Sequence, residues 1–502
     1  MTRSAADVGA GLAPARPARP IAPGERIHVV GIAGAGASAA ALLARAAGAI
    51  VDGCDPGAPS QYTPALESAG IAIAASHDPA HVTPDLDRLA VTKALTAINP
   101  DHPELVAARG HGVAVEAWQQ VVADAASGKR LVAVAGTHGK STTSGWLVHA
   151  LGVAGRDPSA FVGALLPAVQ GAPPSTARSG WGDDFVVEAD EYAGNFDPYR
   201  PDVAILTSVE WDHPDVFADV DAVLDAFERW LRAATAGGRR TTLVANVSDR
   251  GVDRLVRERL ADWAGLVVRV SIDDETTSAA IRARVVAEEP AGTTIELTGL
   301  DDADGDVPRT ARLPTAGRHN VANAVCVAGA ARVLGIPGAA IVAGLETFPG
   351  IGRRLERKGE AGGVVVYDDY GHHPSAIRAT LAALRQREPG RHVWAAYEPL
   401  TYHRTAALLE EFAAVLATAD GVAVADIWAG RDPDTSIASA EKLADAVRAR
   451  RPGLAVGAPG SPEMTADWLA RRVRPGDAVL VMGGGRSYRI GEILLELLGG
   501  AA

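Results

Sequence analysis

The stretch LVAVAGTHGKST (131–142) decides the fold, because it joins a buried-looking strand, a glycine-rich loop and the start of a helix. In this context backbone N–H groups and the helix dipole cradle phosphate. Lys140 is placed to pair with the β- and γ-phosphates of a nucleotide, and the Ser141 hydroxyl is placed to reach a magnesium ion. The two glycines of the loop are three residues apart instead of the usual five, so a tight turn without a ligand stays open as an alternative.

The alternation of strand and helix continues on both sides of this stretch. RIHVVG (26–31) reads as a strand, ASAAALLARAAG (37–48) as the helix that follows, and IVDGCD (50–55) as the next strand. A further start is predicted at GVVVYDD (363–369). Parallel sheets covered by helices produce this pattern, so the fold class is α/β.

The length and apolar content of the chain predict three domains. The 502 residues are 47% hydrophobic, which exceeds what one core uses. The segments 124–130 and 348–354 are small, polar or turn-rich and read as linkers. The predicted division is a disordered tail at 1–24 and domains at 25–128, 129–350 and 351–502. Quick succession of strands between 241 and 298 predicts a small extra sheet in the middle domain.

Charge and cysteine usage limit the partners. A formal net charge of −13 argues against a nucleic-acid backbone or an anionic membrane surface as the main partner. The two cysteines, Cys54 and Cys326, lie far apart, so we expect neither a disulfide framework nor a zinc knuckle. Neither a signal peptide nor a membrane span is predicted. These features favour a cytoplasmic protein with small-molecule substrates.

Titratable residues follow two further strands. FVVEADE (185–191) ends in carboxylates, and VAILTSVEWDHPD (203–215) ends in Asp212, His213 and Asp215. The carboxyl ends of parallel strands face the same crevice as a phosphate loop. Magnesium bound to a nucleoside triphosphate needs only one or two hard protein ligands. Glu188 and His213 are therefore the metal candidates, with a solvated strand end as the alternative.

A second glycine-rich loop, GIAGAG (31–36), also lies between a strand and a helix. Its spacing is GxxGxG and not the GxGxxG dinucleotide fingerprint. Asp52 and Asp55 lie where a Rossmann domain places an acid for a ribose hydroxyl. The loop could bind a hydride-transfer cofactor, or it could be a tight turn without a ligand.

Two later segments collect polar residues. DDYGHHP (368–374) follows a predicted strand and crowds titratable groups into a loop, where catalytic residues often lie. GRHNVANAVC (317–326) opens a helix with Asn320 and Asn323 on one face. The amides could read an adenine edge or cap the helix.

Taken together, these segments resemble the Mur ligase family over nearly the whole chain. The strongest matches are GTHGKST (136–142), EADE (188–191), DHPD (212–215), GRHNVANA (317–324), RRLERKGE (353–360) and DDYGHHP (368–374). The shortened phosphate loop is the family's own variant. The resemblance implies an N-terminal Rossmann-like domain that holds UDP, a central P-loop ATPase domain with a mostly parallel sheet, and a C-terminal Rossmann-like domain that closes over the site.

The resemblance also assigns roles to residues. It implies the catalytic residues Lys140, Glu188, His213, Asn320, Arg354 and Asp369. The ATP-binding residues would be Gly136, Thr137, His138, Gly139, Lys140, Ser141, Thr142, Asn320, Asn323, Arg354 and Asp369. The UDP-substrate would be bound by Gly34, Gly36, Ser38, Asp55, His138, Tyr370, His372 and Arg404. The metal would be held by Ser141, Glu188 and His213.

The implied activity is an ATP-dependent amide-bond ligase of peptidoglycan precursor synthesis. L-alanine would be added to UDP-N-acetylmuramate through an acyl-phosphate, with Mg²⁺ present and Mn²⁺ able to take its place. Tyr192 and WDHPDVF (211–217) instead favour the relative that attaches L-alanyl-gamma-D-glutamyl-diaminopimelate, the tripeptide of murein recycling, to the same sugar acid. Two further classes stay open, a nucleotide-dependent redox enzyme and a non-catalytic UDP-sugar sensor.

Overall fold

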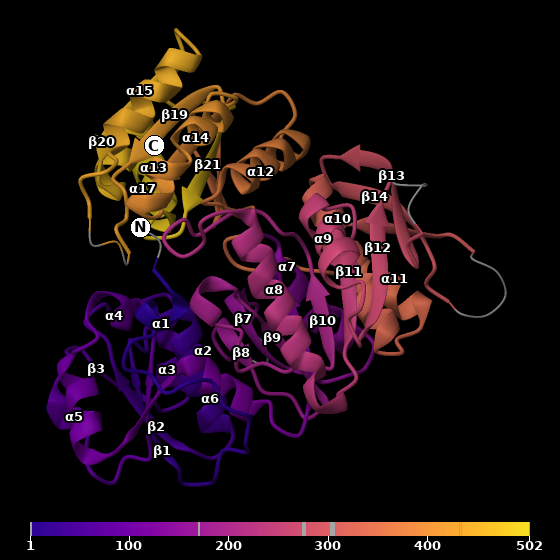
Figure 1. Ribbon diagram of the computed structural model, residues 1–502. Coiled ribbons are helices and arrows are strands. Elements are labelled where there is room, and N and C mark those ends of the chain that lie inside the picture. The colour runs from indigo at the N-terminus through magenta and orange to yellow at the C-terminus, as the bar shows by residue number, and fades with distance from the viewer. Residues whose placement is uncertain are drawn as a thin grey trace.

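The chain forms three bodies, each built on its own sheet. The computed structural model describes residues 3–168, 171–273, 278–301, 307–430, 432 and 434–500. Its sheets have five, ten and six strands. Figure 1 shows the first body in indigo and purple, the second in magenta to salmon, and the third in orange and yellow. The predicted class, α/β with three domains and mostly parallel sheets, is confirmed.

The first domain has a parallel Rossmann-like sheet. In sheet order its strands are β3 (Ala72–Ala74), β2 (Ile50–Cys54), β1 (Arg26–Val30), β4 (Arg88–Val91) and β5 (Ala114–Ala117). Its helices are α2 (Ala35–Ala46), α3 (Thr63–Ser68), η1 (Pro79–His81), α4 (Lys93–Ile98), α5 (Pro103–His111) and α6 (Trp118–Ala125). Successive β1 residues point to opposite faces, so Ile27 and Val29 pack with α2 and α6, and Val30 packs on the α5 side.

The second domain carries one ten-stranded sheet. In sheet order its strands are β15 (Arg309–Leu313), β14 (Gly292–Thr298), β13 (Ile281–Glu289), β12 (Leu266–Ile272), β11 (Thr242–Asn246), β10 (Val203–Leu206), β6 (Arg130–Ala135), β9 (Asp184–Glu188), β7 (Ser159–Leu166) and β8 (Ser175–Arg178). The small extra sheet predicted for 241–298 is wrong, because β12 pairs with β11 and β13 in parallel and thereby joins these strands to the main sheet.

Helices cover both faces of the central sheet. They are α7 (Lys140–Val153), η2 (Tyr192–Gly194), α8 (Val220–Thr235), η3 (Ala236–Gly238), α9 (Arg250–Arg254), η4 (Leu255–Arg259), α10 (Arg318–Val333) and α11 (Gly338–Glu346). Val132 and Val134 of β6 pack on the face of α7 and α10, whereas Ala133 packs on the face of α8. Both faces of the strand before the phosphate loop are therefore buried.

The third domain has a mostly parallel sheet. In sheet order its strands are β16 (Glu356–Ala361), β17 (Val364–Asp369), β21 (Ala478–Gly483), β18 (Val393–Glu398), β19 (Gly421–Ala425) and β20 (Ala455–Gly460), and only β16 runs antiparallel to its neighbour. Its helices are α12 (Pro374–Arg387), α13 (Tyr402–Ala407), α14 (Leu409–Leu416), α15 (Ala440–Arg450), α16 (Pro462–Ala470) and α17 (Tyr488–Gly499). Both faces of the sheet carry apolar clusters.

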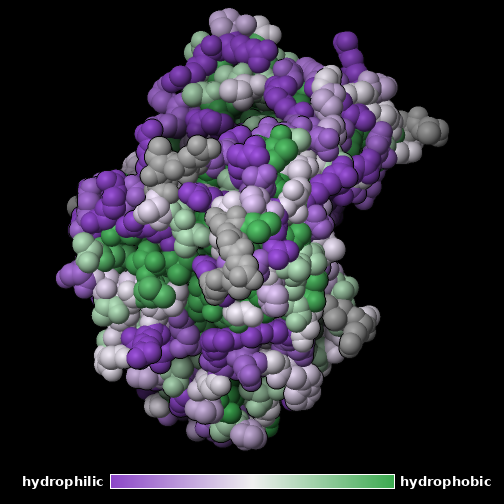
Figure 2. Space-filling model, turned by 90° about the vertical axis from the view of Figure 1, so that its right-hand side faces the viewer, coloured by the Kyte–Doolittle hydropathy of each residue, from purple (hydrophilic) through white to green (hydrophobic). Residues whose placement is uncertain are grey.

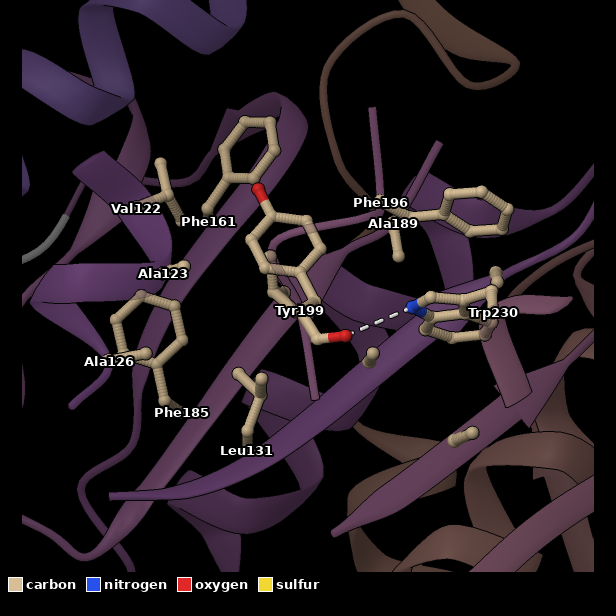
Figure 3. Close-up of a cluster of buried hydrophobic side chains, with 14 of the residues drawn as sticks. Val122, Ala123, Ala126, Leu131, Phe161, Phe185, Ala189, Phe196, Tyr199 and Trp230 are labelled. Atoms are coloured by element: carbon tan, nitrogen blue, oxygen red, sulfur yellow. Dashed lines mark hydrogen bonds between the residues drawn. The ribbon is translucent and has the colours of Figure 1, made fainter. Parts of the chain in front are cut away.

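The first two domains meet through apolar side chains. One continuous buried cluster contains residues of both. Figure 3 shows Val122 and Ala123 of α6, and Ala126 directly after it, close to Phe161 and Phe185 of the central domain. In the same cluster, the Trp230 indole donates a 3.1 Å hydrogen bond to the backbone oxygen of Tyr199. The first two domains therefore share one core.

The prediction of a disordered tail is wrong for residues 3–24. This segment begins with α1 (Ala5–Val8), and Val8 is buried against Tyr192. The guanidinium group of Arg16 lies 2.7 Å from Glu116 and 2.7 Å from Asp124. Both carboxylates are buried and need counter-charges, which explains why an arginine-bearing segment without a long apolar run still packs against the domain.

The surface mixes polar and apolar side chains. On the face shown in Figure 2, hydrophobic residues lie in separate clusters among hydrophilic ones. None of the described helices combines the length and the hydrophobicity that crossing a bilayer requires.

We expect Gly36→Ala to destabilise the protein. A Cβ at residue 36 would lie 2.1 Å from an aromatic carbon of Trp118, so α2 could not keep its distance from α6. Forcing apart such packing costs about 1–3 kcal/mol, which urea or thermal unfolding measures. The control is Gly152→Ala in α7, where a Cβ meets nothing within 4 Å and should stabilise by about 0.5–1 kcal/mol. An unchanged Gly36→Ala variant would contradict the close packing.

Candidate active site

The phosphate loop runs from the end of β6 to the start of α7, and glycines shape its path. Gly136 has a φ of 133° and Gly139 a φ of 80°, both in the region that favours glycine. A Cβ on Gly136 would lie 2.2 Å from the Thr207 hydroxyl, and one on Gly139 would lie 2.3 Å from the Asn323 side-chain oxygen. The loop is therefore held closely by the end of β10 and by α10.

Lys140 begins α7 with its ammonium group turned back under the loop. Its Nζ donates a 2.6 Å hydrogen bond to the Gly136 carbonyl and a 3.0 Å bond to the Glu191 carboxylate, and lies 3.5 Å from Asp190. Burial acts to lower the pKa of Lys140, but the negative charges of Glu191 and Asp190 outweigh it and raise the pKa above its usual value. The lysine is therefore a fixed cation at neutral pH.

Ser141 joins the central and C-terminal domains. Its hydroxyl donates a 3.0 Å hydrogen bond to Glu188 Oε1 and accepts a 2.7 Å bond from Arg354 Nη2. The other oxygen of Glu188 accepts a 2.6 Å bond from the backbone N–H of Gly163. Three predicted site residues thus meet at one hydroxyl group beside the phosphate loop.

His213 lies on the loop after β10 in a left-handed conformation, with a φ of 55°. Its Nδ1 is 3.3 Å from Arg404 Nη2, and its ring centre is 4.9 Å from that of Tyr192. Ligand atoms of Asp190, Glu191 and His213 lie within 4.8 Å of one another. This group could hold a divalent cation.

Of the three predicted metal ligands, Glu188 and His213 therefore have different neighbours. Glu188 lies against Ser141, whereas His213 is grouped with Asp190 and Glu191. Carboxylate oxygens are the ligands that Mg²⁺ prefers, and both neighbourhoods supply them beside Lys140. The sequence analysis selects only Glu188 from the acidic segment after β9, whereas the structure also brings Asp190 and Glu191 to the site.

Two further polar contacts join the C-terminal domain to the central one. Arg404 Nε donates a 2.7 Å hydrogen bond to Asp212, and both side chains are buried. Burial alone would raise the pKa of Asp212, but the charge of Arg404 lowers it well below its usual value. Ser375 donates a 2.6 Å bond to Glu210, which also accepts from His138 at 3.2 Å.

Asp369 fixes the junction between the second and third domains. One carboxylate oxygen accepts a 2.8 Å hydrogen bond from the backbone N–H of Leu355, and the other accepts a 2.7 Å bond from that of Gly371. The guanidinium carbon of Arg354 lies 5.1 Å from the centre of the Tyr370 ring. Asp369 therefore fixes the backbone of the segment that carries Arg354.

Asn320 and Asn323 of α10 are buried and bonded within the protein. Asn320 donates a 2.8 Å hydrogen bond to the Ala316 carbonyl and accepts a 3.1 Å bond from Asn323. Asn323 in turn accepts a 3.3 Å bond from the Thr143 hydroxyl of α7. The two amides thus connect α10 to the helix that begins at the phosphate loop.

Two histidines of the DDYGHHP segment are held neutral. Burial lowers the pKa of His373 to about 4, and burial lowers the pKa of His372 well below its usual value. Neither imidazole therefore carries a charge at neutral pH.

All three domains contribute to one cleft of about 780 Å³. The predicted site residues that line it are Gly36, Thr137, His138, Gly139, Lys140, Ser141, Thr142, Glu188, His213, Asn320, Asn323, Arg354, Asp369, Tyr370, His372 and Arg404. The whole predicted catalytic set is among them.

Some residues predicted for the UDP side do not open onto this cleft. Gly34 is the N-cap residue of α2, and the Ser38 hydroxyl is buried 3.2 Å from that of Thr176 in the central domain. Asp55 accepts a 3.0 Å hydrogen bond from the backbone N–H of Ala33 and so supports the glycine-rich loop. Of the residues predicted from that loop and helix, only Gly36 reaches the cleft.

Several cleft residues were missed by the sequence analysis. Asp190 belongs to the EADE motif (188–191), so its position after β9 was an available signal. Glu210 and Ser375 also line the cleft, and they form a contact across 165 residues of sequence. No local pattern marks that pair.

Family models match consecutive parts of the chain. They are the Mur ligase family catalytic domain over 26–130, the Mur ligase middle domain over 134–331, and the Mur ligase glutamate ligase domain over 353–485. With the three sheets and the shared cleft, these matches define the class. The chain belongs to the Mur ligase family.

Two relatives that match nearly the full length of the chain carry the same name within that family. The UDP-N-acetylmuramate--L-alanine ligase of Kineococcus radiotolerans is 40% identical, covering 94% of this chain and 96% of its own. The ligase of the same name from Gloeobacter violaceus is 37% identical, with coverage of 95% and 97%.

Two solved structures share the fold. The UDP-N-acetylmuramate-alanine ligase of Thermotoga maritima has a TM-score of 0.76 at 23% identity, with 95% of this chain and 100% of that chain covered. A murein peptide ligase from Psychrobacter arcticus has a TM-score of 0.69 at 25% identity, with coverage of 95% and 99%. At 23% identity, the likeness to the Thermotoga maritima structure shows the fold alone.

We expect Arg404→Ala to lower the free energy of unfolding by about 3–5 kcal/mol, because Asp212 would keep a buried charge without its partner. Urea unfolding at neutral pH measures the loss. The Asp212 carboxylate stabilises the native state above its ordinary pKa of 3.8, and this contribution is lost as the pH falls further.

The matched control is Arg471→Ala, which breaks the exposed Arg471–Asp467 pair and should change stability by about 0.5 kcal/mol or less. Equal effects of the two substitutions would contradict the buried pair.

Proposed function

We propose that this Mur ligase adds L-alanine to UDP-N-acetylmuramate at the expense of ATP. The observation that carries the proposal is the single cleft in which the phosphate loop, the carboxylates after β9 and Arg354 of the third domain meet. The names and full-length similarity of the relatives support this substrate pair.

The nucleotide would bind with its phosphates at the start of α7. The loop offers backbone N–H groups and the positive end of the helix dipole, which favour an anion. Lys140 supplies a permanent positive charge at this place. Asn320 and Asn323 would lie beside the nucleotide along the same helix pair.

The carboxylates of the site fit a divalent cation. Asp190, Glu191 and His213 have ligand atoms within 4.8 Å of one another, and Glu188 lies beside Ser141. Mg²⁺, or Mn²⁺ in its place, would be held by these residues and would neutralise charge on the phosphates.

The reaction needs an activated carboxylate, because a carboxylate does not expel oxide when an amine attacks it. The sugar-acid carboxylate would attack the γ-phosphorus of ATP, giving ADP and an acyl-phosphate. Lys140 and Arg354, which both contact the loop at the start of α7, would stabilise charge on the transferring phosphoryl group. The amino group of alanine would then attack the acyl carbon, lose a proton and expel inorganic phosphate.

Water would hydrolyse the acyl-phosphate, so the intermediate must be shielded. The third domain already reaches the cleft through Arg354, Ser375 and Arg404. We assign it the role of a cover that excludes water during the reaction. Tyr370 and His372 would face the muramoyl end or the amino acid. The reaction belongs in the cytoplasm, where ATP is available and the two buried thiols stay reduced.

The substrates are tested by incubating the protein with ATP, Mg²⁺ and UDP-N-acetylmuramate, together with either L-alanine or L-alanyl-gamma-D-glutamyl-diaminopimelate. We expect phosphate release with L-alanine and little with the tripeptide. The reverse result would assign the protein to tripeptide recycling. If neither L-alanine nor the tripeptide led to phosphate release when the protein is saturated with ATP, the proposal would be overturned.

We expect Lys140→Ala to lower kcat for phosphate release by about 100- to 1000-fold, because a preorganised positive charge on the phosphoryl group is lost. Circular dichroism establishes whether the variant is folded. Lys442→Ala, at an exposed position of α15, is the control and should keep full activity. Unchanged turnover in Lys140→Ala would refute the assignment of the loop.

A further inference from the structure

The first domain buries a second cluster of titratable side chains, away from the nucleotide cleft. Its members share metal-ligating chemistry and none of them lines the cleft. They are His28, Cys54, His77, His81, His102 and Glu104. The chain has 13 histidines and two cysteines in all, so this concentration on one side of a small sheet calls for an explanation.

Four separate elements bring the cluster together. His28 lies in the middle of β1, and Cys54 is the last residue of β2. His81 is the last residue of η1, and Glu104 lies in the first turn of α5. All four point to the α5 face of the sheet, where Cys54 belongs to the apolar cluster of that face. A bound ion would therefore add one more link between segments that backbone pairing, hydrogen bonds and packing already join.

The distances suit a single ion. The Cys54 sulfur lies 3.1 Å from Glu104 Oε1 and 3.4 Å from His28 Nε2, and His81 Nδ1 lies 2.8 Å from the same carboxylate oxygen. The four ligand atoms are all within 4.8 Å of one another. Two nitrogens, one sulfur and one oxygen at such separations can surround one tetrahedral cation.

Glu104 needs positive charge in its surroundings. Its side chain is 0% exposed, and among the described residues its ion-pair partners are four histidines. A buried carboxylate is stable only when it is paired or bound to a metal. Histidines supply that charge only when protonated, whereas a metal ion supplies it at neutral pH.

Two features outside the four ligands also fit a metal. Asp52 lies 2.6 Å from Nδ1 of His28, which leaves Nε2 of His28 free to point at the cluster as a lone-pair donor. Carboxylates that orient ligand histidines in this way are common around protein-bound zinc. In addition, Nδ1 of His102 is buried and has no hydrogen-bond partner among the residues that the structure describes. It lies 3.7 Å from Glu104, in a residue that is 6% exposed.

We propose that the first domain binds one zinc ion through His28 Nε2, Cys54 Sγ, His81 Nδ1 and a carboxylate oxygen of Glu104. Cys54 would bind as the thiolate, and its proton would pass to the solvent when the ion enters. Imidazole and thiolate ligands select Zn²⁺ over Mg²⁺ or Ca²⁺. The second carboxylate oxygen is held by His77, whose Nδ1 lies 3.3 Å away.

The ion would support the glycine-rich loop of the first domain. The carbonyl of Cys54 accepts a 2.8 Å hydrogen bond from the backbone N–H of Gly31, where that loop begins. Asp55, the next residue, bonds to Ala33 in the same loop. Fixing the end of β2 therefore fixes the base of the glycine-rich loop. The zinc site has this structural role and is separate from any cation that accompanies ATP.

The test uses the full-length protein, freed of metal with a chelator and then titrated with Zn²⁺ against a chromophoric competitor. Metal content is measured by mass spectrometry, and Co²⁺ is added in place of zinc to record its visible spectrum. The variants are Cys54→Ser, His81→Gln and Asp52→Asn. The controls are His111→Gln, at the exposed end of α5, and Cys326→Ser in α10.

We expect one zinc per chain in the natural protein and in both controls. Cys54→Ser should remove the sulfur-to-cobalt charge-transfer band and weaken zinc binding by more than about 100-fold, and Asp52→Asn should weaken it by about 10- to 100-fold. His81 is partly exposed, so His81→Gln should fold and still lose stoichiometric zinc. Failure of the natural protein to bind zinc stoichiometrically, or equal affinity in Cys54→Ser, His81→Gln and the controls, would overturn the proposal.

Discussion

An ammonium group is stable inside a protein only when anions surround it, and Lys140 imposes this requirement on the site. The carboxylates of Glu191 and Asp190, in the segment after β9, supply the negative charge beside the ammonium group. The carbonyl of Gly136 accepts a further hydrogen bond from it. These contacts draw the phosphate loop and the acidic segment to the same edge of the sheet. An arriving triphosphate would compete with those carboxylates for the lysine, and a divalent cation could then take up the carboxylates that are released.

Ser141 extends this arrangement to the third domain. Its hydroxyl contacts Glu188 on one side and Arg354 on the other, so one small side chain links the central sheet to the domain above it. Arg354 is flanked by Arg353 and Leu355, whose φ values of 56° and 47° are unfavourable for residues with side chains. Asp369 holds Leu355 in that conformation. The geometry of the junction is thus maintained by specific hydrogen bonds, not by backbone preference.

Sequence reasoning succeeded where the signal was local. The strand, loop and helix at 131–142 lie within twelve residues, and the predicted catalytic set does line one cleft. It failed where partners are distant or composition misleads. Ser375 meets Glu210 across 165 residues, and the tail at 3–24 is held by carboxylates whose burial no local pattern reveals. Strand β20 gives little signal in the sequence, because AVGAPG (455–460) has a single β-branched residue.

The two interdomain boundaries differ in chemistry, and this has a consequence for how the molecule can be taken apart. One apolar core contains Phe161, Phe185 and the apolar side of α6. Cutting the chain between the first and second domains would therefore expose a hydrophobic surface on both fragments. The contacts of the third domain described above are made by arginines, carboxylates and hydroxyls, which water can solvate as readily as protein does. We therefore expect the first two domains to move together, and the third domain to be the one that is displaced when the cleft opens.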